Sequence, residues 1–130
     1  MTATVTRDTG SRLAVWAWRA GFVAACLLQL YGVYAPREAG PNVGIPSADK
    51  IAHFFLFGSV AFLGLKVRLP ARWLLGALVA NAVISEVVQH YLLPQRDGNV
   101  FDAVADLAGV AVGAWLGFRM FRGPRASRTT

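Results

Sequence analysis

The sequence predicts an all-α integral membrane protein, a bundle of four transmembrane helices with both ends of the chain in the cytoplasm. The composition is 55% hydrophobic and only 15% charged over 130 residues, whereas a soluble domain averages about 25% charged. The mean hydropathy is +0.46. Four apolar stretches are each close to the roughly 20 residues that a helix needs to cross the hydrocarbon core. They lack the alternation of a strand, so we expect helices.

The first stretch, at about 13–35, follows Arg7 and Arg12 and ends before Pro36. Its apolar run is too long for a signal peptide, and Pro36 makes its exit a poor cleavage site. We therefore expect a retained helix, preceded by a short cytoplasmic segment at 1–12.

The second and third stretches, at about 51–67 and 72–93, are separated from each other and from their neighbours by proline. Pro46 precedes the second stretch, Pro70 lies between the two, and Pro94 follows the third. Proline interrupts helices, so we expect the connections at these residues.

The fourth stretch, at about 101–121, carries acidic residues and glycines that recur every three or four positions. The members of this stripe are Asp102, Asp106, Gly109, Gly113 and Gly117. Small residues at this spacing let two membrane helices pack closely, so we expect the stripe to face the bundle interior. A basic cytoplasmic tail, 122–130, is expected to follow, which makes 13–121 the membrane domain.

The distribution of basic residues predicts the orientation. With the beginning of the chain inside, the cytoplasmic segments hold nine basic residues: Arg7, Arg12, Lys66, Arg68, Arg72, Arg119, Arg122, Arg125 and Arg128. The opposite side holds three, namely Arg37, Lys50 and Arg96. Cytoplasmic loops carry the excess of Lys and Arg in membrane proteins, so both ends are expected to be cytoplasmic.

Polar side chains converge on the side opposite the two chain ends. In the third stretch, Ser85, Glu86 and Gln89 fall within an arc of roughly 100°. Together with the starts of the second and fourth stretches, they predict a polar cluster near the outer leaflet. The polar cluster consists of Asp49, Lys50, His53, Glu86, Gln89, Arg96, Asp102 and Asp106. Charged groups inside membrane spans are unfavourable without a partner or a function, so this cluster is the candidate site.

The order and spacing of these residues resemble the VanZ-like membrane proteins. The family pattern is approximately D-K-x-x-H, E-x-x-Q, P-x-R and D-x-x-x-N/D-x-x-G-x-x-x-G. The matching residues are Asp49, Lys50 and His53, then Glu86 and Gln89, then Pro94 and Arg96, then Asp102, Asp106, Gly109 and Gly113. The resemblance covers roughly residues 47–117, and Asp106 stands where many members have Asn.

The resemblance implies a multi-pass protein of the bacterial inner membrane. It also implies a role at the cell envelope, in susceptibility to glycopeptides such as teicoplanin. It implies no defined reaction.

Three interpretations of the polar cluster remain open. It binds an anionic lipid or a lipid-linked envelope precursor, with Arg96 and Lys50 facing a phosphate. Alternatively, it is the site of a hydrolase or transferase in which His53 and either Glu86 or Asp106 exchange protons. In the third interpretation the cluster only fixes helix packing, through ion pairs such as Glu86 with Arg96 or Asp106 with Lys50, in a scaffold or assembly subunit of a membrane complex.

Other partners and cofactors are not indicated. The basic residues sit at the ends of apolar segments and form no basic face for a nucleic acid, despite a sequence pI near 10.5. Glu86 and His90 are four residues apart, but no paired-cysteine or H-E-x-x-H spacing predicts a metal site. We expect no cofactor. Membrane lipids are the expected partners, and the glycine stripe is also compatible with a homo-oligomer or a membrane-protein partner.

Overall fold

The computed structural model describes residues 3–36, 47–96 and 98–123 and contains four α-helices. In chain order these are α1 (Ala3–Tyr34), α2 (Ala48–Lys66), α3 (Ala71–Leu92) and α4 (Val100–Phe121). Each helix contains a segment long and apolar enough to cross a membrane. No strand occurs in the described ranges. The predicted fold class, an all-α membrane bundle of four helices, is confirmed.

The ends of the helices lie close to their predicted positions, except at the start of α1. We expected the first helix to begin near residue 13, but α1 begins at Ala3. The residues before 13 are mostly polar but include no proline, and polar residues do not by themselves stop a helix. The apolar span itself is Thr9–Tyr34. Arg37, Pro46 and the part of the predicted tail after residue 123 lie outside the described residues.

The helices α2 and α4 run parallel and pack with their backbones in contact. A Cβ atom added to Gly109 would overlap the carbonyl group of Phe54, and one added to Gly113 would overlap that of Gly58. Glycine is required at such points because any side chain would force the helices apart. The stripe on α4 is buried along its whole length, as predicted.

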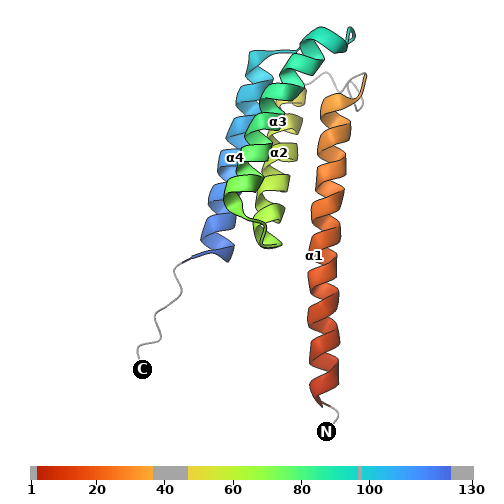
Figure 1. Cartoon of the computed structure of the whole chain (residues 1–130), viewed down its shortest axis with the longest axis vertical. Coiled ribbons are helices and arrows are strands. Elements are labelled where there is room, and N and C mark those ends of the chain that lie inside the picture. Colours follow the sequence, from red (N-terminus) through yellow and green to blue (C-terminus); the bar gives the residue numbers. More distant parts are fainter. Residues whose placement is uncertain (1–2, 37–46, 97, 124–130) are drawn as a thin grey trace.

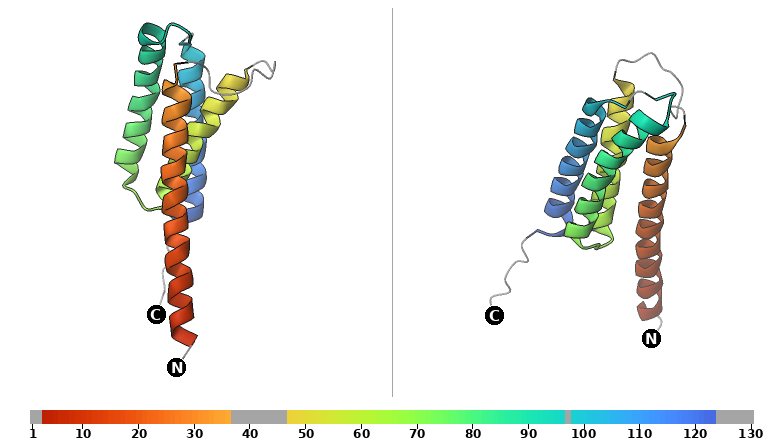
Figure 2. Two further views of the ribbon diagram at one scale, coloured as in Figure 1. Left: turned by 90° about the vertical axis from the view of Figure 1, so that its right-hand side faces the viewer. Right: turned by 45° about the horizontal axis from the view of Figure 1, so that its top comes forward.

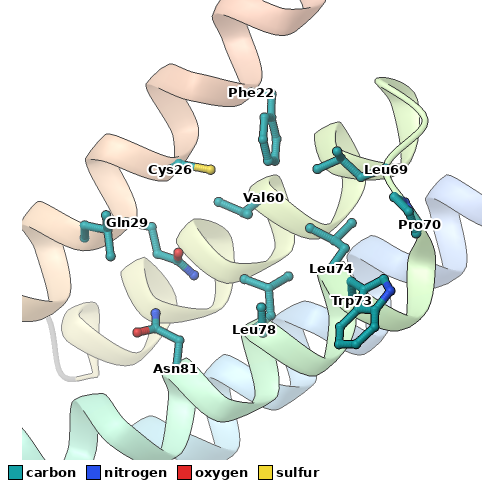
Figure 3. Close-up of a pocket in the computed structure, with 12 residues that line it drawn as sticks. Phe22, Cys26, Gln29, Val60, Leu69, Pro70, Trp73, Leu74, Leu78 and Asn81 are labelled. Atoms are coloured by element: carbon teal, nitrogen blue, oxygen red, sulfur yellow. The ribbon is translucent and has the colours of Figure 1, made fainter.

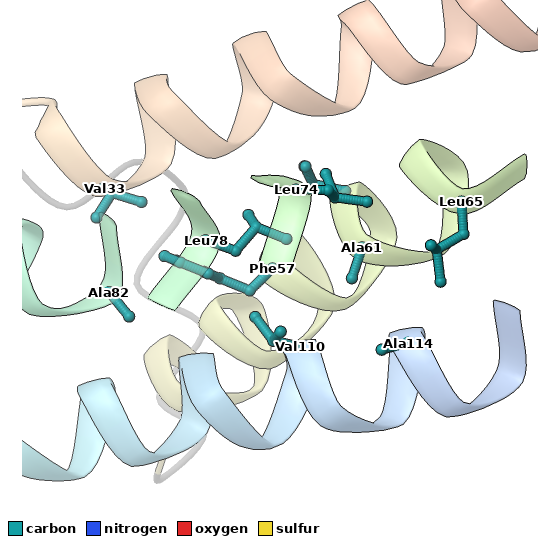
Figure 4. Close-up of a cluster of buried hydrophobic side chains, with 10 residues drawn as sticks. Val33, Phe57, Ala61, Leu65, Leu74, Leu78, Ala82, Val110 and Ala114 are labelled. Carbon is teal, nitrogen blue, oxygen red and sulfur yellow. The ribbon is translucent and has the colours of Figure 1, made fainter. Parts of the chain in front are cut away.

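The apolar core lies around α2, which packs against each of the other helices (Figure 4). Phe57 and Leu65 of α2 are fully buried. The partners that cover them are Val33 of α1, Leu74, Leu78 and Ala82 of α3, and Val110 and Ala114 of α4. Because α2 packs against every other helix, the inward-facing side chains of its first turns, such as His53, are buried.

The two ends of the bundle differ in what they contain (Figures 1 and 2). The start of α1, the turn between α2 and α3, and the end of α4 lie at one end. The end of α1, the start of α2, the end of α3 and the start of α4 lie at the other. This second end is where the polar cluster was predicted. The assignment of the first end to the cytoplasm stays a prediction.

Candidate functional site

The polar cluster forms where the first turns of α2 and α4 meet the last turns of α3. His53 of α2, Gln89 of α3, and Asp102 and Asp106 of α4 are buried, with exposed fractions of 5% or less. Ser85, next to Glu86, is also fully buried, and its hydroxyl donates to the carbonyl of Ala82 in its own helix. The side chains that the sequence pattern placed at this end of the bundle therefore lie there.

The centre of the site is a buried pair formed by His53 and Asp106. The distance from His53 Nδ1 to Asp106 Oδ1 is 2.8 Å, and the two side chains are 4% and 0% exposed. An ionised Asp106 accepts a hydrogen bond from the Nδ1–H group, which leaves Nε2 as the nitrogen available for proton exchange. A carboxylate in this position also holds the imidazole ring in one orientation.

Lys50 lies at the rim of the site, one turn before His53. Its Nζ atom is 3.3 Å from Asp49 Oδ2 and 3.4 Å from Asp102 Oδ1. The contact with Asp102 is an ion pair without hydrogen-bond geometry, since no donor is aligned with this oxygen among the described residues. The Lys50 side chain is 31% exposed, whereas that of Asp102 is 7% exposed. Lys50 therefore covers the outer side of the buried carboxylates.

The expected ion pair between Asp106 and Lys50 is wrong, and the reason is the register of the two helices. Because α2 and α4 run parallel, residues at similar distances from the starts of the two helices face each other. Lys50 stands opposite Asp102, and His53 stands opposite Asp106 one turn deeper. Lys50 therefore lies one helical turn nearer the end of the bundle than Asp106 does, and it contacts Asp102.

Gln89 and Arg96, both predicted to bind a ligand, form hydrogen bonds with the end of α1. Gln89 Nε2 donates to the carbonyl of Val33 at 2.8 Å. Arg96 Nη1 donates to the carbonyl of Gly32 at 2.8 Å and also approaches that of Ala35 at 3.3 Å. The last carbonyl groups of a helix lack partners within the helix, and a cation there also complements the helix dipole. These two side chains thus fasten α1 to the bundle.

The expected ion pair between Glu86 and Arg96 is not found among the described residues. Arg96 is directed to the carbonyls of α1 instead, and the buried Oε1 atom of Glu86 has no hydrogen-bond partner among the described residues. Glu86 as a whole is half-buried, because it lies at the border between the exposed and the buried face of α3.

Three buried carboxylate oxygens within and beside the pair lack a hydrogen-bond donor in the described part of the chain. They are Glu86 Oε1, Asp102 Oδ1 and Asp106 Oδ2. Buried polar atoms in folded proteins nearly always have a partner, so each such exception calls for an explanation. All three atoms are acceptors, and all three side chains belong to the same cluster. The site therefore offers acceptor oxygens to hydrogen-bond donors, and Asp102 Oδ1 lies 3.4 Å from the ammonium group of Lys50.

Metal binding is not supported by the described residues, where no three His, Cys, Asp or Glu side chains come close enough to hold an ion. His90, considered with Glu86 as a ligand, is exposed and stacks edge-on against Tyr91.

Sequence reasoning missed one buried polar residue outside the cluster, Gln29 of α1, which is 4% exposed. The sequence contained a signal for it, since an amide side chain inside an apolar span is unfavourable unless it faces the bundle interior and finds a hydrogen-bond partner.

No protein family model, no curated protein and no solved structure matches this chain. Function therefore has to be inferred from the geometry of the site.

Proposed function

We propose that this protein is a VanZ-like protein of the bacterial cell envelope that binds a lipid-linked envelope component through the polar cluster. By doing so it changes susceptibility to glycopeptides of the teicoplanin type. The observation that carries the proposal is the group of three buried carboxylate oxygens, within and beside the His53–Asp106 pair, that have no hydrogen-bond donor among the described residues. A cluster that served packing alone would be expected to satisfy its own buried atoms.

The chemistry of the cluster favours a ligand with two kinds of group. Lys50, at the rim, is the cation that a phosphate would meet, because its side chain is 31% exposed although it also contacts Asp49 and Asp102, whereas the Nη1 group of Arg96 is bonded to α1. Glu86, Asp102 and Asp106 offer acceptor oxygens to hydroxyl, amide or ammonium donors. A lipid-linked sugar or peptide precursor carries both a phosphate and such donors. A simple anionic lipid with no donor groups would leave the carboxylates unsatisfied.

The depth of the cluster fits a headgroup. Asp106 lies six residues after the start of α4, which corresponds to about 9 Å at 1.5 Å per residue. His53 lies at a similar level, five residues after the start of α2. A group attached to a lipid phosphate at the membrane surface can reach this depth while its tail stays in the bilayer.

The test is complementation of a deletion strain, scored for sensitivity to teicoplanin, with variant levels in the membrane measured by blot. We expect Glu86→Gln, Asp106→Asn and Lys50→Met to accumulate normally and fail to restore the wild-type response. His90→Gln is the matched control, because His90 lies one turn from Glu86 on the same helix but is exposed. Full complementation by all three site variants would overturn the proposal and would favour the scaffold alternative.

A membrane hydrolase or transferase acting on a lipid-linked phosphate is the second candidate. It is favoured by the orientation of His53 by Asp106, the arrangement that a general acid or base requires. For this candidate, purified protein should release phosphate or transfer the headgroup from a lipid-linked pyrophosphate, and His53→Gln should abolish turnover. If the protein binds the lipid but releases no product, the result excludes the enzyme and supports the binding function.

A further inference from the structure

A largely apolar cavity lies between α1, α2 and α3, away from the polar cluster (Figure 3). Its volume is about 420 Å³, within the range of pockets that hold small ligands. Two of its lining side chains, Leu30 of α1 and Trp73 of α3, are 46% and 69% exposed, so the cavity opens to the surroundings between these two helices. In a membrane these surroundings are lipid.

One wall of the cavity carries a buried hydrogen-bond donor without an acceptor. Gln29 is 4% exposed, and its Nε2 atom has no partner among the residues that the structure describes. Its side chain faces that of Asn81 across the cavity (Figure 3). Asn81 Oδ1 accepts a hydrogen bond from the hydroxyl of Tyr34, so the part of this amide that an occupant meets is its NH₂ group, also a donor. An unpaired amide donor is unfavourable in hydrocarbon, so the occupant of the cavity has to bring an acceptor.

The two facing amides lie near the middle of the membrane span. Asn81 is ten residues after the start of α3 at Ala71 and eleven residues before its end at Leu92. At 1.5 Å per residue it is about 15–17 Å from either end, half of a hydrocarbon core of about 30 Å. Gln29, which faces Asn81, is therefore deeper in the membrane than the polar cluster. Lipid headgroups and ester carbonyls lie outside the hydrocarbon core and do not reach this depth.

The acceptor that suits this depth is the carbonyl oxygen of an apolar molecule. A phosphate or a carboxylate carries a charge, and an unpaired charge at the bilayer centre is strongly unfavourable. A hydroxyl group or a water molecule brings donors of its own, which in turn would need acceptors. A carbonyl oxygen brings only acceptor capacity, and its two lone pairs match two amide N–H groups.

The walls of the cavity favour a carbonyl that is carried on a planar ring. Phe22 of α1 and Trp73 of α3 provide aromatic surfaces, and Val60, Leu74 and Leu78 contribute aliphatic ones (Figure 3). Aromatic side chains pack favourably against planar rings. Lipid quinones combine such a ring with two carbonyl oxygens and a hydrocarbon tail, and they dissolve in the bilayer interior, to which the cavity opens.

We propose that the cavity binds the ring of a membrane-dissolved quinone, with one carbonyl oxygen accepting a hydrogen bond from Gln29 Nε2. The ring lies against the apolar walls, and the tail leaves through the opening between α1 and α3. Binding gives the amide of Gln29 the acceptor that it lacks among the described residues. The inference does not depend on the function of the polar cluster.

The natural chain contains its own reporter, since Cys26 is the single cysteine and lines the cavity. The rate of Cys26 modification by N-ethylmaleimide is measured for purified protein in detergent micelles, as a function of the mole fraction of added probe. The probes are duroquinone, a tetramethyl benzoquinone, and hexamethylbenzene, in which methyl groups replace both carbonyl oxygens. Neither probe has a free ring position to which the thiol could add. We expect duroquinone to reach half-protection at a mole fraction about two- to ten-fold lower than hexamethylbenzene, the ratio that one hydrogen bond supplies.

Two variants make the result specific. In Gln29→Leu the two probes should protect Cys26 equally, because the donor is gone while an apolar wall remains. In the control C26A/L27C the thiol is moved to the lipid-exposed side of α1, where Leu27 is 62% exposed, and neither probe should slow its modification. Absent protection of wild-type Cys26 by duroquinone, or equal protection by the two probes, would overturn the proposal. So would a preference for duroquinone that persists in Gln29→Leu or that is equally large in C26A/L27C.

Discussion

At the scale of single residues, His53 and Asp106 depend on each other because both are buried. Asp106→Ala leaves His53 Nδ1 without its partner and should lower the free energy of unfolding by about 1–3 kcal/mol. Asp106→Asn keeps an acceptor oxygen at the same place and should lose less than about 1 kcal/mol, as hydrogen bonds between membrane helices usually contribute. Thermal unfolding of the purified variants in detergent measures both.

Asp49→Asn serves as the control for this prediction, since Asp49 lies at the rim and contacts only Lys50 among the described ion pairs. Its unfolding temperature should match that of the wild type. If Asn and Ala at position 106 destabilise the protein equally, the hydrogen bond with His53 does not contribute to stability.

At the scale of helices, the seam between α2 and α4 tolerates no side chain. Gly113→Ala would place a methyl group against the carbonyl of Gly58, so the two helices would have to separate. We expect a loss of about 1–3 kcal/mol in the free energy of unfolding, as for other overpacked interiors. Chemical or thermal unfolding in detergent provides the measurement.

The matched control is Gly76→Ala on α3, where an added Cβ meets no atom within 4 Å. Helix propensity alone should make this variant as stable as the wild type or up to about 1 kcal/mol more stable. A Gly113→Ala variant that is as stable as Gly76→Ala would show that α2 and α4 can separate at no cost.

The attachment of α1 depends on Arg96, which bonds the final carbonyls of the helix. Arg96→Leu should increase deuterium uptake in the last turn of α1, because those groups lose their cap and the turn frays. Hydrogen exchange followed by mass spectrometry measures this uptake. Arg72→Leu is the control, since Arg72 is exposed at the opposite end of the bundle and stacks on Trp73. Unchanged uptake in Arg96→Leu would assign the fastening of α1 to Gln89 alone.

At the scale of the whole molecule, the four spans put the start of α1 and the end of α4 at one end of the bundle. The excess of basic residues at this end predicts that it is cytoplasmic. Alkaline phosphatase fused after Thr130 should therefore be inactive, because its disulfides form only outside the cytoplasm. The same enzyme fused after Gln95, in the turn between α3 and α4, should be active. The reverse pattern would place the polar cluster at the inner leaflet.

Much of this architecture could be predicted from the order of residues along the chain. The four helices and most of their ends follow from apolar length and proline, because a bilayer allows few alternatives for a segment of that length. The inward direction of Asp102, Asp106 and the glycines follows from their three- and four-residue spacing. The membership of the polar cluster follows from the same periodicity on α2 and α3.

The partners of those residues could not be predicted in the same way. Which cation meets which carboxylate depends on the parallel register of α2 and α4, and a change of one turn would pair Lys50 with a different acid. The bonding of Arg96 to α1 joins residues more than sixty positions apart.

The largely apolar cavity is lined by residues of α1, α2 and α3, and the amide nitrogen of Gln29 on its wall has no partner among the described residues. The sequence by itself thus determined the helices and the faces they bury, since these depend on spacing within one segment. Only the tertiary structure decided the pairings and the cavity, since these depend on how separate segments are placed against one another.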